Sequence, residues 1–568
     1  MLIFLLVFCV FSLLPINVSG YHHPHRYYNK THEGKLTVTI PWSTVIGKQE
    51  RILGRPIGVF LGIPYAKPPV GQLRFIKPVP LDPHDGEYNA TFFRPPCPQP
   101  PNVNTNYPET SENCLYLNVW TPVISSSLAS NHIESSSLKP VIIYIYGGGF
   151  NKGSVHEKRH QGDILSSLSD TVVVTVNHRL SIFGFGYSGT ESIPGNIGIY
   201  DLIQSLEWVN QNIEHFGGNP KAVTIFGACS GAMAASAFIL SPIVDAKLID
   251  KVYLASSVIS PHSAIRTQEE TFNLTRTVAE IVGCGNADDP EATKLTDQQV
   301  DCMRGIDAQV LMNASFSDPV MNQLSYKETP PFVMIYNTTL LPIPPDQLVL
   351  EKYPRRRVPI LFGNEQNEDE IFTKLWPASI EEAKKMLNYM IMRTYPNTTE
   401  EQVETVFKYY FDKVEDYNVM EIKGALSLAA GDYLHHCPLL LYTESWTKNG
   451  QITHGYLDAY VMDGFNKSER LFGTKHGDAA YQILGKAYHE YDTFSDRDRR
   501  VTRQMIKFIK SFAYGQRLNW PPMLTDSSKS VLPLKWRLTK TMDTKNIYSD
   551  PKDDICHLWG EIRQLVVG

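Results

Sequence analysis

The segment Ala222-Val-Thr-Ile-Phe-Gly-Ala-Cys-Ser-Gly-Ala-Met-Ala-Ala-Ser236 joins an apolar run to a stretch of small residues. Val223–Phe226 is typical of a strand, and the residues that follow have helical character. A strand, a sharp turn and a helix form the setting of a nucleophile elbow, in which Gly-x-nucleophile-x-Gly lifts a reactive side chain above the sheet. Gly227 and Gly231 bracket Cys229 at positions minus two and plus two. The pattern therefore predicts a nucleophile position occupied by cysteine.

The composition indicates a large globular protein. The chain has 568 residues, 42% of them hydrophobic, which is enough for a sizeable core. Its 53 Lys and Arg residues are outnumbered by 59 Asp and Glu, so the net charge is −6. Nucleic-acid-binding domains are usually basic, so this balance gives no electrostatic case for a nucleic-acid partner.

The N-terminal segment Met1–Gly20 has the pattern of a secretory signal peptide. Its apolar run, Leu2–Leu14, is too short to span a bilayer, and Val18-Ser-Gly20 offers small residues for cleavage. No other stretch approaches eighteen apolar residues. We therefore expect a secreted, extracellular protein without a transmembrane anchor.

Residues 21–33 are polar and rich in histidine. The histidines suit a metal site, but a flexible leader is favoured because no cysteine lies nearby and chain termini of this kind are usually disordered. We predict neither a metal nor a cofactor.

After the signal, seven Asn-x-Ser/Thr sequons predict glycosylation: Asn29, Asn89, Asn273, Asn313, Asn337, Asn397 and Asn466.

Two segments carry a family resemblance. They are Gly58-Val-Phe-Leu-Gly-Ile-Pro-Tyr-Ala-Lys-Pro-Pro-Val-Gly-Gln-Leu-Arg-Phe75 and Glu112-Asn-Cys-Leu-Tyr-Leu-Asn-Val-Trp120. Both closely resemble the type-B carboxylesterase/cholinesterase family of α/β-hydrolases, although Asn113 stands where the family usually has Asp. The resemblance extends over about 34–559 and implies one catalytic domain, 34–568. It implies an α/β-hydrolase fold, with a large, mostly parallel central sheet and helices on both faces.

The hydrophobic pattern agrees with that fold class. Thr171–Val176 is made of β-branched residues and predicts a strand, and Val358–Phe362 resumes the same pattern later in the chain. Apolar residues at helical spacing predict a helix over Ile199–Ile213. Strands that alternate with helices favour a parallel sheet. We expect residues 240–350, which are less regular, to form cap and rim segments around the site.

The segment Val141-Ile-Ile-Tyr-Ile-Tyr-Gly-Gly-Gly-Phe150 is a buried-strand pattern that ends in three glycines. It resembles the oxyanion-hole loop of the family. Backbone without side chains can direct N–H groups at a developing oxyanion. The resemblance therefore implies an oxyanion hole made by Gly148, Gly149 and Ser230.

The resemblance also implies the other two catalytic residues. In the family, the catalytic acid follows a strand-end glycine by five residues, which gives Glu368 in this chain. The acidic loop leaves Glu365, Asp369 and Glu370 as competitors for that role. The segment Gly473–Gly485 resembles the family's histidine segment and implies His476 as the catalytic base.

The chain has eight cysteines, of which Cys9 lies in the expected signal peptide. Family resemblance pairs Cys97 with Cys114, Cys284 with Cys302, and Cys437 with Cys556, although the sequence alone permits other pairings. This map leaves Cys229 unpaired.

Three interpretations of Cys229 remain open. In the first, Cys229 is a nucleophile activated by His476 and Glu368. In the second, the site is degenerate and the protein is a secreted binding or adhesion protein. The third is a small buried or redox-sensitive thiol. Retention of the histidine, the acid and the triple glycine favours ester hydrolysis, whereas the family's Gly-Glu-Ser-Ala-Gly elbow has changed at both Ala228 and Cys229. Ser230 is a weaker candidate nucleophile because it lies one residue away from the bracketed position.

The expected partner is a small-molecule ester if the site is active and a protein if it is not. Cholinesterases bind the choline ammonium with a tryptophan in the first disulfide loop, through a cation–π contact. The corresponding residues 98–113 contain no tryptophan, and Tyr107 is their only aromatic residue. A choline ester is therefore not the expected substrate.

Overall fold

The computed structural model describes residues 31–100, 109–122, 137–259, 265–285, 291–324, 329–351, 357–368, 377–465, 473–526, 529–532, 534–538, 547–549 and 553–563. The expected signal peptide, the sequons at Asn29 and Asn466, and the competitor acids Asp369 and Glu370 lie outside these ranges. The first strand begins at Thr31, so the last three residues of the expected leader, 21–33, belong to the sheet.

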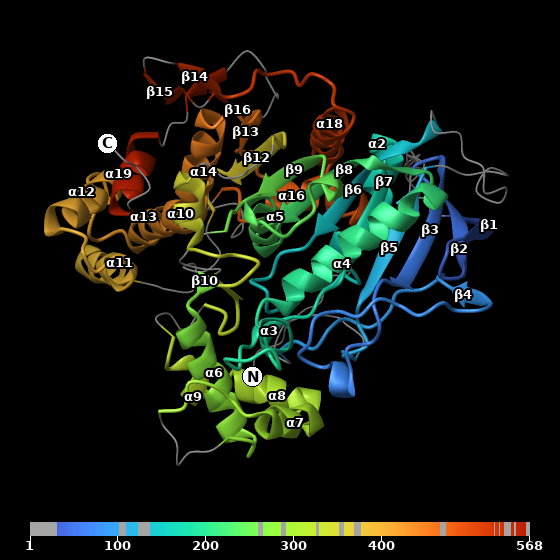
Figure 1. Cartoon of the computed structure of the whole chain (residues 1–568). Helices are drawn as coiled ribbons and strands as arrows, with labels where there is room; N and C mark the ends of the chain where they lie inside the picture. The colour runs from blue at the N-terminus through green and yellow to red at the C-terminus, as the bar shows by residue number, and fades with distance from the viewer. Residues whose placement is uncertain are drawn as a thin grey trace, which may run out of the picture.

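A twisted sheet runs through the molecule (Figure 1). Within the described ranges it has thirteen strands, in the order β1-β2-β3-β5-β7-β6-β8-β9-β12-β13-β16-β17, with β4 paired to β2. The strands are β1 Thr31–Thr39, β2 Thr44–Ile52, β3 Arg55–Pro64, β4 Glu87–Asn89, β5 Tyr116–Thr121, β6 Lys139–Ile145, β7 Val172–Val176, β8 Gly218–Ala228, β9 Lys251–Ala255, β12 Ile360–Glu365, β13 Thr453–Asp458, β16 Leu534–Leu538 and β17 Ile547–Ser549. Short pairs are formed by β10 Ile265–Arg266 with β11 Met334–Ile335, and by β14 Leu524–Asp526 with β15 Lys529–Leu532.

The central strands from β7 to β16 are parallel, whereas β1, β2, β3 and β5 pair antiparallel at the N-terminal edge. The prediction of a mostly parallel α/β sheet is confirmed. The antiparallel edge follows from the chain order, because β1, β2 and β3 are joined by short turns that leave no room for a crossover helix.

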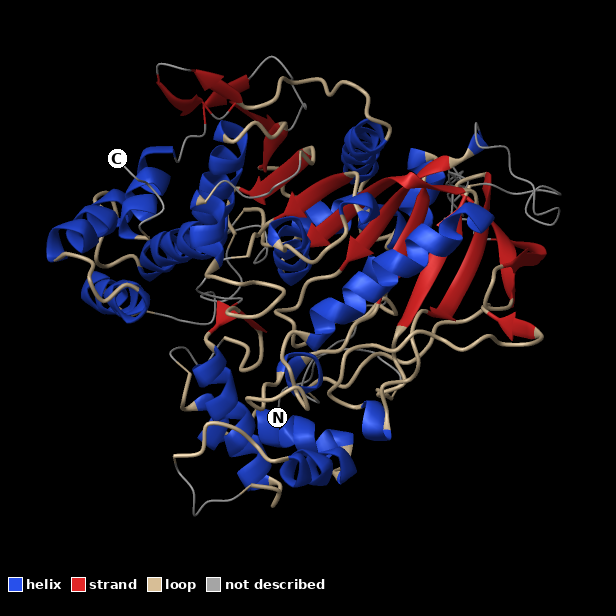
Figure 2. Ribbon diagram, in the orientation of Figure 1, coloured by secondary structure: helices blue, strands red, loops and turns tan. Residues whose placement is uncertain are grey.

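Helices cover both faces of the sheet (Figure 2). The helices are α2 Asp163–Ser169, α3 Ser181–Phe185, α4 Ile197–Asn212, α5 Ser230–Leu240, α6 Gln268–Ile281, α7 Asp297–Gly305, α8 Ala308–Ser315, α9 Asp318–Met321, α10 Pro345–Leu350, α11 Ile380–Thr394, α12 Glu400–Phe411, α13 Val419–Gly431, α14 Cys437–Lys448, α16 Asp478–Ile483, α17 Lys486–His489, α18 Asp496–Ala513 and α19 Asp553–Ile562. The long helix α4 crosses one face, and α2 and α18 pack together on the other (Figure 2).

The predicted helix over Ile199–Ile213 is confirmed as α4, which begins two residues earlier and ends in a 3-10 turn. It forms because Leu202, Leu206 and Val209 lie on one buried face. Residues between 240 and 350 form β9, β10, β11 and helices α6 to α10, of which α6 to α9 gather below the sheet in Figure 1.

Three disulfides tie the fold together, and the predicted pairing is confirmed. Cys97 bonds to Cys114, Cys284 to Cys302, and Cys437 to Cys556. The third joins α14 to α19 across 119 residues of sequence. In the part of the chain that the structure describes, Cys229 is the free cysteine. No helix in that part is long and apolar enough to cross a membrane.

Candidate active site

The elbow lies between β8 and α5, where Cys229 adopts φ 53° and ψ −122°. This backbone conformation is costly for a residue with a side chain, so the surroundings must hold it. The Cys229 N–H donates to the Ala255 carbonyl at 3.0 Å, and its own carbonyl accepts from Ala232 and Met233. These hydrogen bonds maintain the strained backbone conformation, which places the Cys229 side chain at the end of β8, above the parallel strands.

The two glycines of the elbow are required by close backbone contacts. A Cβ at Gly231 would lie 2.0 Å from the Ile145 carbonyl oxygen, and one at Gly227 would lie 2.3 Å from the Gly231 carbonyl oxygen. No side chain fits at such distances, so only glycine lets β8, β6 and α5 approach this closely.

The loop after β6 brings backbone donors to the thiol. A Cβ at Gly147 would lie 2.6 Å from the Cys229 Cβ, and Gly148 has φ 136°, a conformation that favours glycine. The backbone N–H groups of Gly148 and Ser230 lie near the Cys229 sulfur and favour its thiolate form. Gly149 follows on the same loop, where a Cβ would lie 2.8 Å from Pro330. The backbone of Gly148 and of Ser230 therefore lies beside the thiol at the elbow.

The structure brings Cys229, His476 and Glu368 together from three separate parts of the chain. The Cys229 thiol and the His476 ring lie close enough to shift each other's pKa. The His476 Nδ1 lies 2.7 Å from Glu368 Oε2, and Glu368 is 1% exposed. Among the competitor acids, Glu365 hydrogen-bonds Ala479 and Ser256 instead of the histidine. Glu368 is thus the described carboxylate that contacts His476.

The surroundings favour a charged thiolate–imidazolium pair. Burial works against the Cys229 thiolate, but His476 and the N–H groups of Gly148 and Ser230 outweigh it and lower the pKa of Cys229 below its ordinary value. Burial likewise opposes the His476 cation, but Cys229 and Glu368 raise the pKa of His476 well above its ordinary value. A thiolate is the nucleophilic form of cysteine.

Two neighbours of this site have contacts that the sequence did not predict. His435 stacks on His476 from the π-helical turn Asp432–His436 between α13 and α14. Glu365 lies at the end of β12 and hydrogen-bonds Glu368. The one sequence signal for Glu365 was its place in the acidic loop, and His435 had none beyond its position two residues before Cys437.

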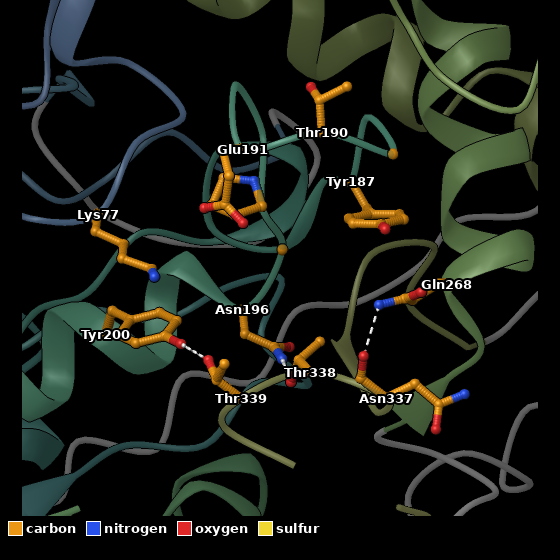
Figure 3. Close-up of a pocket in the computed structure, with 13 residues that line it drawn as sticks. Lys77, Tyr187, Thr190, Glu191, Asn196, Tyr200, Gln268, Asn337, Thr338 and Thr339 are labelled. Carbon is orange, nitrogen blue, oxygen red and sulfur yellow. Dashed lines mark hydrogen bonds between the residues drawn. The ribbon is translucent and has the colours of Figure 1, made fainter. Parts of the chain in front are cut away.

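The described sequons differ in exposure. Asn89, Asn313, Asn337 and Asn397 are exposed, and Asn273 is half-buried on α6. Asn337 borders a cavity of about 410 Å³, where Gln268 donates to the Asn337 carbonyl (Figure 3). Lys77 lies 4.6 Å from the ring centroid of Tyr200 in the same cavity. Its lining includes none of the residues that surround the Cys229 thiol.

Comparisons with known proteins place the chain in a family. Residues 34–555 match the model of the carboxylesterase family. The chain is 31% identical to acetylcholinesterase-1 of Trittame loki, over 80% of this chain and 82% of that protein. It is 30% identical to carboxylesterase 1D of Rattus norvegicus, over 83% of each chain, and 28% identical to cholinesterase of Mus musculus, over 94% of this chain and 88% of that protein. This protein therefore belongs to the carboxylesterase family.

Proposed function

We propose that this protein hydrolyses carboxylic esters, with Cys229 as the nucleophile, His476 as the general base and Glu368 as the residue that orients His476. The observation that carries the proposal is the placement of His476 beside the Cys229 thiol, with its Nδ1 2.7 Å from the buried Glu368 carboxylate. This is the order of roles in a catalytic triad, with a thiol in place of the hydroxyl.

Each step of the reaction can be assigned to a group of this site. The Cys229 thiolate attacks the ester carbonyl carbon and forms a C–S bond, while the carbonyl oxygen takes the negative charge. The backbone N–H groups of Gly148, Gly149 and Ser230 donate hydrogen bonds to that oxyanion. The His476 imidazolium then gives its proton to the leaving alkoxide, the C–O bond breaks, and an acyl thioester with Cys229 remains.

Water completes the cycle. Neutral His476 removes a proton from a water molecule, whose oxygen attacks the thioester carbonyl. Collapse of the second tetrahedral intermediate breaks the C–S bond and releases the carboxylic acid. Cys229 leaves as a thiolate, beside a His476 that is again protonated. Glu368 holds the Nδ1–H of the ring and stabilises its charge in both half-reactions.

Secretion is part of the proposal. Three disulfides in one chain are typical of proteins that fold in an oxidising compartment. Four of the described sequons are exposed, as enzymatic glycosylation requires. Expression in animal cells should therefore release a glycoprotein into the medium, with a mass that decreases after enzymatic removal of N-linked glycans. Retention of an unglycosylated chain in the cytosol would contradict this part.

The test of the activity uses purified protein with short-chain p-nitrophenyl esters. We expect hydrolysis that iodoacetamide abolishes and that Cys229→Ala removes, whereas organophosphates, which favour activated serine, act weakly. Ser230→Ala is the matched control, because it keeps the Ser230 backbone N–H and should retain hydrolysis. Activity that persists in Cys229→Ala would overturn the assignment. Absence of activity in the folded wild-type protein would favour a binding or adhesion protein with a protein partner.

A further inference from the structure

Glu365 lies directly behind the acid of the triad. It is fully buried at the end of β12. Its Oε1 accepts from the Ala479 N–H at 3.0 Å, and its Oε2 hydrogen-bonds the Ser256 hydroxyl. Its carboxyl also lies near that of Glu368, whose Oε1 accepts from the Glu365 backbone N–H at 2.8 Å. Two buried carboxylates side by side repel each other, so their placement favours one proton shared by the pair.

The remaining contacts indicate which carboxyl carries the proton. Glu368 Oε2 contacts His476 Nδ1, and Glu368 Oε1 accepts from the Glu365 backbone N–H at 2.8 Å. Glu368 is the acceptor in both contacts, so the Glu365 carboxyl is the side chain left to donate between the two. Burial raises the pKa of the Glu365 carboxyl well above its ordinary value, and the Glu368 charge beside it raises the pKa further.

We propose that Glu365 is a positioning residue that shares one proton with Glu368, and that this shared proton weakens the hold of Glu368 on His476. The proposal rests on the proposed function in that it takes His476 as the partner of Cys229. A donor to Glu368 draws electron density away from the oxygen that faces Nδ1. His476 is then a weaker base than it would be beside a Glu368 carboxylate that accepts no hydrogen bond from Glu365.

Other titratable groups surround the pair, and the substitutions at Glu365 leave their side chains unchanged. Those that face it are Tyr253 of β9, Tyr456 and Asp458 of β13, Asp478 of α16, and His476, with Cys229 and His435 on the far side of the histidine. Burial raises the pKa of Asp458 well above its ordinary value and that of Asp478 to about 7. Burial also raises the pKa values of both tyrosines, so both phenols are neutral at pH 7.

Two substitutions separate the shared proton from the side chain that carries it. Glu365→Gln keeps a neutral donor toward Glu368 and an acceptor for the Ala479 N–H. Glu365→Leu introduces a side chain of similar volume that has no donor. The Glu368 carboxylate would then interact with His476 without a competing hydrogen bond from position 365. The leucine should therefore raise the pKa of His476 and lower the pKa of the Cys229 thiol, and the glutamine should not.

The readout is the rate of alkylation by iodoacetamide as a function of pH, with Cys229→Ala as the background. In Glu365→Leu we expect the midpoint of the profile to move toward lower pH by about one unit, because a hydrogen bond that opposed the pull of Glu368 on His476 is lost. In Glu365→Gln we expect the wild-type midpoint. A leucine variant with the wild-type midpoint would overturn the proposal. So would a glutamine variant whose midpoint moves to higher pH, because that change indicates loss of a negative charge.

Infrared spectroscopy tests the proton itself and does not need the leucine variant to fold. A protonated carboxyl absorbs at higher frequency than a carboxylate, so the wild-type minus Glu365→Gln difference spectrum at pH 7 should contain a protonated-carboxyl band. Its absence would overturn the proposal. Neither measurement depends on ester turnover. A protein with the shifted profile and the band but without hydrolysis would keep the carboxyl pair and refute the proposed function.

Discussion

The imidazole rings of His435 and His476 lie with their centroids 4.2 Å apart and their planes 32° from parallel. His435 is 5% exposed, and its Nδ1 lies 3.3 Å from the Ser257 hydroxyl. Burial lowers the pKa of His435 well below its ordinary value, and the charges of His476 and Arg563 lower it further. The histidine pair therefore contains one ring that takes up a proton and one that stays neutral.

The first prediction concerns stability in acid. Above pH 6.5, His435 is neutral in both the folded and the unfolded chain, so it does not change the stability with pH. Below pH 6.5 the unfolded chain binds a proton that the folded chain does not, so the stability falls as the pH falls. At pH 5 this loss is about 2 kcal/mol for an unfolded histidine of ordinary pKa.

His435→Gln should remove that loss, because glutamine does not titrate and can still hydrogen-bond Ser257. We expect the difference in unfolding free energy between pH 7 and pH 5, measured in urea, to be smaller in the variant by about 2 kcal/mol. His84→Gln, on the surface, is the control and should leave the difference unchanged. An equal pH dependence in His435→Gln and the wild type would contradict a neutral His435.

The second prediction compares two glycines. Gly231→Ala forces a Cβ to 2.0 Å from the Ile145 carbonyl oxygen, so β6 and α5 must separate. We expect a loss of at least about 3 kcal/mol of stability, or no secreted protein. Gly424 lies within α13 and has no atom within 4 Å of an added Cβ. Gly424→Ala should therefore stabilise the protein by about 0.5–1 kcal/mol, because alanine loses less entropy in a helix. Equal thermal midpoints in the two variants would refute the packing argument.

The elbow could be predicted from sequence because its constraints are local. The spacing of Gly227, Cys229 and Gly231 is set within one turn, and the neighbouring strands and helices have clear apolar periods. The family resemblance implied Glu368 and His476 as the catalytic acid and base, although they are 108 residues apart in the sequence. The structure brings the two side chains into contact.

Glu365 and His435 could not be assigned in the same way. The role of Glu365 depends on its contact with Glu368 and on contacts with Ser256 and Ala479, which come from two other segments. His435 reaches His476 because a π-helical turn joins α13 to α14, and no periodic pattern in the sequence indicates that turn. The antiparallel strands at the N-terminal edge also depended on pairing, which local pattern does not determine.

The third prediction concerns the disulfides. The Cys437–Cys556 bond spans 119 residues and the Cys97–Cys114 bond spans 17, and all four cysteines are buried. In the chain-entropy model, a bond that closes a longer loop restricts the unfolded chain more, by about 5 kcal/mol against about 3 kcal/mol here. Replacement of both cysteines of the long-range pair by alanine should lower the thermal midpoint more than the same change in the short pair. The reverse order would show that local packing outweighs loop length.

The last prediction asks whether the site still supports the chemistry of a serine nucleophile. Cys229→Ser introduces a smaller atom at the elbow, so the substitution fits without overpacking. Its hydroxyl would meet His476 as general base, with Gly148 and Ser230 as donors to the oxyanion. One such donor typically contributes about 10²–10³ in rate, so even a partly aligned hole gives measurable turnover. We expect folded Cys229→Ser to hydrolyse short acyl esters above background and to react with organophosphates.

The matched control is Cys229→Ser with His476→Ala, which keeps the serine and the oxyanion donors and removes the base. It should lose both ester hydrolysis and the reaction with organophosphates, because a serine hydroxyl without a base is a poor nucleophile at neutral pH. Turnover that survives in this double variant would come from a group other than the elbow. A folded Cys229→Ser protein without either reaction would mean that Glu368, His476 and the glycine loop no longer form a competent framework. The hydrogen bonds around Cys229 would then be a remnant of the fold, and binding would be the better account of the protein.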